Sequence, residues 1–509
     1  MKKSAASLLT GLLAALVASG TGAEPVVTRV DRDGADAFRI DFTGPTNHWY
    51  YVQVADRLDE PHWRNPCVIW STGVTAVSFW EGATRSSVFR ILQDPIPTAH
   101  VARYRNLHSN LFAFADRVAA LPPKTNEPHT ALGLPSLLSN GNRGWTLLTA
   151  TNRTRMLSEC DRYHEMGAGV LKLDITYPLL TPSFHQQLAN QPGYGWYAGI
   201  TVTNYLLVYA ELIQRARSNG MAIAIEHSSL IPSYSVIDPF FYYDEIRALG
   251  ADAGRQRYRA ERSAECELIM QWLAPDFFSV VLEPDAQNTH FGGFDLQPLM
   301  YPEQWQSYVQ QVVDDLAVLF PMQDTRMGAG LGTWEDETYK DLFIAVTNLH
   351  YVDLHIYPLA NSDTHYLTNM IQWCDDVMAA GKRVSIGEAW LYKASAEDMQ
   401  NGNAFHDEVY ARDLYGFWEP LDIAFIQVVD QFARKQDMLF LAFFWPNYLF
   451  GYVDYTTGFQ LDPGQTPDDL PPSVRLGMAD DILMDALSVP QPFYTETGRV
   501  MQRLFSQGE

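Results

Sequence analysis

The chain has 509 residues, of which 13% are aromatic, and its formal net charge at pH 7 is −24. An acidic protein repels the phosphates of nucleic acids and of anionic lipids, so the composition argues against nucleic-acid and membrane partners and favours a neutral ligand. The length accommodates one large domain together with a smaller one.

The first 23 residues have the pattern of a secretory signal peptide. Lys2 and Lys3 precede an apolar run over residues 5–17, and small residues follow at 19–23. The run is too short to span a bilayer, and no later stretch is long and apolar enough to do so. We therefore expect a cleaved signal at 1–23 and a protein that is secreted or periplasmic.

Residues 25–97 are predicted to form a small all-β, sandwich-like accessory domain. Short β-prone runs at 38–42, 49–54 and 87–92 are separated by turn-rich segments. Residues 98–129 are predicted to be a linker that includes a lead-in helix at about 107–121.

Residues 130–509 alternate between short apolar runs and helical stretches. This alternation is typical of parallel strands joined by crossover helices, and eight such runs predict a closed (β/α)₈ TIM barrel. An open doubly wound sheet is the alternative, but it needs a glycine-rich phosphate turn after the first strand, and residues 141–144 do not form one. The runs lie at 131–137, 169–175, 221–227, 277–283, 326–332, 351–357, 383–389 and 439–446.

Four cysteines in an exported chain raise the question of disulfides. Cys160, Cys266 and Cys374 fall in separate predicted helices that are not neighbours in the barrel, and Cys67 lies alone in the N-terminal region. Because a disulfide needs α-carbons within about 7 Å, we expect free thiols.

Polar side chains gather where the predicted strands end, which is the face of a TIM barrel that carries the active site. Two runs end in a carboxylate, Glu283 and Glu388. Glycoside hydrolases cleave glycosidic bonds with a pair of carboxyl groups, which two strands of one sheet can supply. The other polar or aromatic residues expected to contact the substrate are Asp174, Glu226, His227, His355, Tyr357, Trp390, Trp445 and Asn447.

The carboxylates ending the fourth and seventh strands, Tyr357 on the sixth and Trp445 on the eighth resemble glycoside hydrolase clan A, over roughly residues 130–509. The resemblance implies a retaining hydrolase of a β-linked neutral polysaccharide or oligosaccharide, with Glu388 as nucleophile and Glu283 as acid/base. We expect no metal and no cofactor. One position departs from the clan pattern: Leu282 stands where an asparagine usually precedes the acid/base.

Two other functions remain open at this level. A metal-dependent sugar isomerase or epimerase would use Glu283, Glu226, His227, His355 and Asp174 around a divalent cation. A catalytically inactive barrel would only hold glycans through its aromatic loops. Glu335, in an acidic segment at 335–337, is interpreted as part of a helix start.

Overall fold

The computed structural model describes residues 26–32, 37–43, 48–55, 64–70, 74–80, 88–125, 129–231, 235–292, 299–357, 365–393, 411–444, 446–455, 461, 463–478, 482 and 494–506. The predicted signal peptide lies outside these residues. Within them, no helix combines the length and the apolar character that crossing a bilayer requires.

The chain divides into two compact units, residues 1–106 and 107–509. In the first unit the strands form two three-stranded antiparallel sheets, in the orders β1-β2-β5 and β4-β3-β6. That these sheets make a sandwich remains a prediction. The strands are β1 (Val26–Arg32), β2 (Ala37–Thr43), β3 (His48–Ala55), β4 (Arg64–Trp70), β5 (Val74–Trp80) and β6 (Val88–Pro95).

The second unit is the predicted (β/α)₈ barrel. Its strands close in the order β10-β11-β12-β13-β14-β7-β8-β9, and each sequence neighbour is a parallel neighbour. A strand of the barrel overlaps each of the eight predicted runs, and two of the strands extend two residues beyond their runs. The strands are β7 (Ala131–Pro135), β8 (Val170–Tyr177), β9 (Ala222–Ser229), β10 (Phe277–Ser279), β11 (Arg326–Gly332), β12 (Tyr351–Ile356), β13 (Arg383–Ala389) and β14 (Phe440–Phe443).

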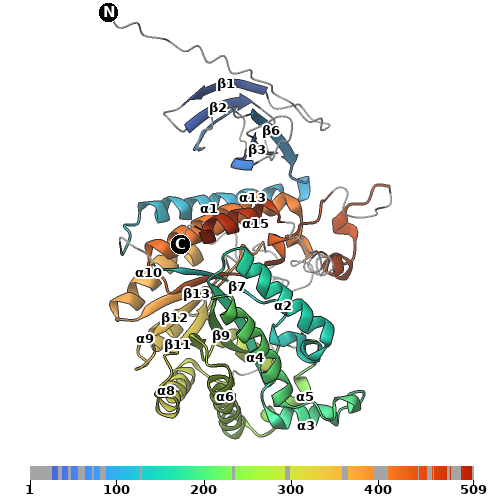
Figure 1. Cartoon of the computed structure of the whole chain (residues 1–509), viewed down its shortest axis with the longest axis vertical. Helices are drawn as coiled ribbons and strands as arrows, with labels where there is room; N and C mark the ends of the chain where they lie inside the picture. Colours follow the sequence, from blue (N-terminus) through green and yellow to red (C-terminus); the bar gives the residue numbers. More distant parts are fainter. Residues whose placement is uncertain are drawn as a thin grey trace, which may run out of the picture. The chain divides into compact units, whose positions relative to one another are not determined.

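Helices surround the strands as an outer ring (Figure 1). They are α1 (Val101–Ala120), α2 (Ala150–Glu165), α3 (Pro182–Ala189), α4 (Val202–Ser218), α5 (Phe240–Ala248), α6 (Ala251–Leu273), α7 (Pro284–Gly292), α8 (Pro302–Leu319), α9 (Thr338–Ile344), α10 (His365–Ala379), α13 (Glu419–Lys435) and α15 (Glu496–Ser506). Cys160, Cys266 and Cys374 lie on α2, α6 and α10 as free, buried thiols, which confirms the prediction for these three.

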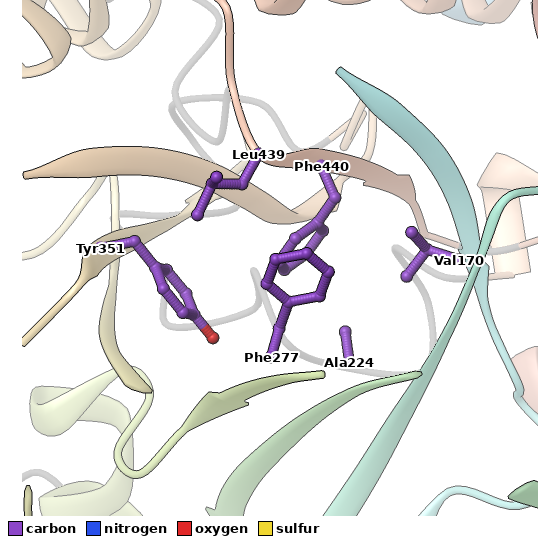
Figure 2. Packing of buried hydrophobic residues seen from close by; sticks show 6 residues of the cluster. All are labelled: Val170, Ala224, Phe277, Tyr351, Leu439 and Phe440. Carbon is purple, nitrogen blue, oxygen red and sulfur yellow. The ribbon is translucent and has the colours of Figure 1, made fainter. Parts of the chain in front are cut away.

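An apolar cluster fills the barrel interior near the amino ends of the strands. Val170, Phe277, Tyr351 and Phe440 are each the first residue of a strand, and their side chains pack together (Figure 2). This cluster fills the barrel at the amino ends of the strands, as is usual in TIM barrels, whose sites lie at the carboxyl ends.

Above this cluster the interior becomes polar. The carboxylate of Asp353 accepts hydrogen bonds of 2.7 Å from the hydroxyls of Ser279 and Ser385 and is fully buried. Because side chains alternate along a strand, the inward position of Asp353 also directs His355 inward, as the alternation of β12 predicts. On β8, the same alternation directs Lys172 and Asp174 inward.

The alternation breaks in β13, one residue before its carboxylate. Ser385 pairs with Asp353 and Ile386 with Leu354, but the next partner, His355, pairs with Glu388. Gly387 is therefore an extra residue, a β-bulge. If Gly387 paired with His355 in a regular register, Glu388 would point outward toward the helices, so the bulge directs Glu388 into the barrel.

Candidate active site

The ammonium group of Lys172 lies at the centre of three buried carboxylates. Its Nζ is 2.7 Å from Asp174, 2.5 Å from Glu388 and also ion-paired with Glu226. These partners come from β8, β13 and β9. Buried charges are stable only when paired, and this single cation contacts carboxyl groups from three different strands of the barrel.

His355 joins the two predicted catalytic residues. Its Nδ1 is 2.6 Å from Glu283 Oε1 and 3.4 Å from Glu388 Oε2, so these two oxygens lie at most about 6 Å apart, the sum of the two distances. Retaining glycosidases hold their carboxyl groups about 5–5.5 Å apart, and inverting enzymes hold them about 6.5–9.5 Å apart. The structure thus brings Glu283 and Glu388 together at the closer spacing.

Side-chain exposure increases toward these two carboxylates. Lys172 is 0% exposed and Glu226 and His355 are each 1% exposed, whereas Glu388 is 9% and Glu283 21% exposed. Asp174 is 6% exposed, so Glu283 and Glu388 are the two most exposed charged groups of the cluster around Lys172 and His355.

The surroundings of Glu388 favour its ionised form. Burial alone would raise the pKa of Glu388, but Lys172, His355 and a hydrogen bond from the Tyr357 hydroxyl hold the pKa below its ordinary value. A carboxylate that stays ionised at neutral pH is suited to act as a nucleophile.

The pKa values of His355 and Glu226 are raised, whereas that of Glu388 is lowered. Burial opposes the charge of His355, yet Glu388 and Glu226 hold the pKa of His355 well above 6.5, so the imidazole is protonated at neutral pH. Burial raises the pKa of Glu226 to about 8 despite the nearby Lys172. Asp174 is further fixed by a hydrogen bond of 3.1 Å from the Asn140 amide.

Aromatic rings border the Glu388 carboxylate. Tyr357 stacks on Trp334 with ring centroids 5.0 Å apart, and it meets Trp390 edge to face at 5.7 Å. Trp390 and Asn447 are both buried. Trp334 follows the fifth predicted run but was not among the residues expected to contact the substrate, and the predicted Trp445 lies outside the described residues.

The structure does not bring His227 into this group. Its imidazole faces α6 on the outer side of β9, where Nε2 is 2.8 Å from Glu265 and Nδ1 is 3.3 Å from Arg262. Glu226 points inward, so its sequence neighbour must point outward. We therefore leave His227 out of the substrate site.

Glu226, His355 and Glu388 each place one potential ligand atom within 4.8 Å of the others, so a metal has to be considered. The ammonium of Lys172 already occupies the position between Glu226 and Glu388. These residues do not fit a metal, which disfavours an isomerase of the predicted kind.

Comparison with known proteins shows similarity in fold at low sequence identity. No family model matches the chain, and no match to a curated protein sequence was found. The fold is similar to those of TIM-barrel glycosidases of families 5 and 26 of clan A, and the sequence itself does not assign a family.

Three solved structures illustrate this similarity. The exo-β-1,4-mannosidase Op5Man5 from Opitutaceae bacterium strain TAV5 is 11% identical, with a TM-score of 0.42 over 76% of this chain and 60% of that chain. A modular endo-β-1,4-mannanase of family 26 from Cellulomonas fimi is 13% identical, with a TM-score of 0.38 over 76% and 75%. A mutant family 5 mannosidase from Rhizomucor miehei, in complex with mannosyl-fructose, is 13% identical, with a TM-score of 0.40 over 74% and 95%.

Proposed function

We propose that this protein is an exported, retaining glycoside hydrolase that cleaves β-glycosidic bonds in a neutral polysaccharide or oligosaccharide. One observation carries the proposal: a carboxylate oxygen of Glu283 and one of Glu388 both contact Nδ1 of His355, so these oxygens lie at most about 6 Å apart. Glu283 and Glu388 are also the two most exposed charged groups of this buried cluster.

The first step is attack on the sugar. The Glu388 carboxylate, kept ionised by Lys172 and oriented by the Tyr357 hydroxyl, attacks the anomeric carbon. Glu283 donates its proton to the departing glycosidic oxygen, and a covalent glycosyl-enzyme ester remains on Glu388.

The second step releases the sugar. Glu283, now ionised, removes a proton from water, and the water oxygen attacks the anomeric carbon. The ester bond to Glu388 breaks, and the configuration at that carbon is retained. His355 stays protonated beside both carboxylates and stabilises whichever of them carries negative charge.

Glu388→Gln tests the nucleophile. It preserves the size of the side chain but cannot form the ester, so we expect turnover to fall at least about 10⁴-fold while the folded structure remains. The assay measures reducing ends released from a panel of neutral polysaccharides and dinitrophenol released from 2,4-dinitrophenyl β-glycosides.

Mass spectrometry supplies a second readout. A 2-deoxy-2-fluoro β-glycoside of an accepted sugar should label the wild-type peptide that contains Glu388 and should leave Glu388→Gln unlabelled. Full activity in this variant would overturn the assignment. Glycan binding without hydrolysis in the wild-type protein would instead support a non-catalytic glycan-binding barrel.

A further inference from the structure

The backbone of Glu283 has an unusual conformation. Its φ is +44°, in the left-handed region that side-chain-bearing residues rarely adopt. Such a conformation persists only where the surrounding structure imposes it, and it is common at functional sites. Glu283 immediately precedes α7, and its carbonyl accepts the helical hydrogen bond of 2.9 Å from Gln287 N.

Glu335 holds the chain just after Glu283. One oxygen of the Glu335 carboxylate accepts hydrogen bonds from the backbone N–H groups of Asp285, at 2.6 Å, and Ala286, at 3.4 Å. The other oxygen accepts from Gly332 N at 2.9 Å. Glu335 is not in α9, the helix that it was predicted to start; its side chain instead caps the first turn of α7 and ties that turn to the end of β11.

A second contact reinforces this connection. The Tyr339 hydroxyl, on α9, donates a hydrogen bond of 2.6 Å to the Asp285 side chain. Glu335 is buried, and burial together with the neighbouring Glu283 holds the pKa of Glu335 well above its ordinary value. Among the described residues, no cation forms an ion pair with the buried Glu335 carboxyl group. Its hydrogen bonds to backbone N–H groups are therefore its evident role.

We propose that Glu335 is a positioning residue, which fixes Glu283 in its left-handed conformation and so aims the proton donor at the leaving-group oxygen. This inference rests on the proposed glycosidase function. Glu335 acts only through residues 283–286 and does not itself touch the substrate.

The kinetic test compares leaving groups. A dinitrophenolate departs without a proton, whereas a phenolate needs one, so a misplaced acid harms only the second reaction. For Glu335→Ala we expect kcat/KM to fall at least about tenfold more with a phenyl β-glycoside than with the 2,4-dinitrophenyl β-glycoside of the same sugar. Glu335→Gln, which keeps one acceptor oxygen, should show a smaller difference in the same direction.

Glu337→Gln is the matched control, because Glu337 is an exposed carboxylate two residues away without a side-chain cap hydrogen bond. It should behave as the wild type with both substrates. An equal loss with both leaving groups, or no loss, in the Glu335 variants would overturn the inference.

A crystal structure of Glu335→Gln or Glu335→Ala separates this inference from the proposed function. We expect residues 283–286 to leave their present backbone conformation, while Lys172 and Glu388 keep theirs. An unchanged positive φ at Glu283 would overturn the positioning role even in an active enzyme. If instead the wild-type protein hydrolyses no glycoside, the proposed function fails, and the crystal structure still decides whether Glu335 holds this turn.

Discussion

A single buried lysine sets the electrostatics of the site at the scale of individual residues. Lys172 has no exposed surface and pairs with three carboxylates, and these partners hold the pKa of Lys172 well above its ordinary value although burial opposes its charge. Removing one partner of a buried ion pair leaves charges without compensation, which is far more costly than losing a surface pair.

Lys172→Met should therefore lower the free energy of unfolding by about 3–5 kcal/mol at neutral pH. Without the ammonium the pKa of Glu388 should rise, so the acidic limb of the kcat/KM profile should move to higher pH. The stability loss should shrink in mild acid, where the stranded carboxylates become protonated. Denaturant unfolding in mildly acidic and in neutral buffer measures this difference.

Lys124→Met is the control for this experiment. Lys124 forms an ion pair of 2.9 Å with Asp375, but both side chains are more than 40% exposed. Exposed pairs contribute about 1 kcal/mol or less, so this variant should be nearly as stable as the wild type. Equal losses in the two variants would contradict the role assigned to Lys172.

Sequence reasoning identified most of these residues but not their arrangement. The ends of the strands indicated Asp174, Glu226, Glu283, His355 and Glu388, all of which the structure places together. Sequence reasoning also indicated His227, although strand alternation allows only one of the adjacent residues Glu226 and His227 to face inward. The central position of Lys172 depends on contacts with β9 and β13, and no local pattern reveals such contacts.

At the scale of the element, the bulge in β13 explains a glycine that precedes the proposed nucleophile. A Cβ atom on Gly387 would overlap Glu226 Oε1 and would lie 2.9 Å from Asp353 Oδ2. The bulged residue thus has to be small, because the side chains of β9 and β12 fill the space beside it.

Gly387→Ala should therefore displace Glu226 or distort the bulge. We expect a loss of about 1–3 kcal/mol in the free energy of unfolding, together with a drop in kcat/KM of at least about tenfold, because Glu388 would no longer align with the anomeric carbon. Thermal melting and the dinitrophenyl glycoside assay measure the two effects.

Gly477→Ala is a suitable comparison, since a Cβ there meets no atom within 4 Å and Gly477 has no positive φ. It should leave kcat/KM unchanged and should not lower the free energy of unfolding, because Gly477 lies in a helix, where alanine is the more favourable residue. A Gly387→Ala variant with normal stability and activity would contradict the requirement for a residue without a side chain at the bulge.

At the scale of the whole molecule, several carboxyl groups are buried with raised pKa values. Burial is the first cause in each case. A carboxyl group whose folded pKa exceeds its unfolded value near 4.5 keeps its proton only in the folded protein, so stability falls as the pH rises through that interval. The groups and values are Glu159, Asp413 and Glu419 at about 7, and Glu226 and Glu265 at about 8.

The melting temperature should consequently decrease from about pH 6.5 to about pH 9. His355, whose pKa is raised above 6.5, contributes in the same direction, because its proton is lost from the unfolded chain first. Below this interval His185 and His227 act oppositely, since burial lowers their pKa values and the unfolded chain takes up protons there. Calorimetry at constant ionic strength measures the trend.

Glu265→Gln provides an internal comparison for the pH trend. Its side chain cannot ionise, so the variant should show a shallower decrease than the wild type over the same interval. A melting temperature that rises toward pH 9 in the wild type would contradict the assignment of these buried carboxyls as protonated.

The fold of the second unit was predictable because its signals are local and repeated. Apolar runs alternate with helical stretches, and every run overlaps a strand of the barrel. The bulge at Gly387 and the hydrogen bonds from the backbone of residues 285 and 286 to Glu335 were not predictable, because each depends on contacts between residues distant in sequence. The predicted signal peptide and the function of the first unit remain predictions.

The bulge also has an evolutionary consequence. A relative that had lost this one residue would keep the barrel, its strand order and an inward attacking carboxylate, because the glutamate would then pair with the same histidine in regular alternation. A relative that kept the residue but paired it in regular register would instead turn the carboxylate outward among the helices. A one-residue gap at this point of an alignment therefore does not by itself mark a relative as inert.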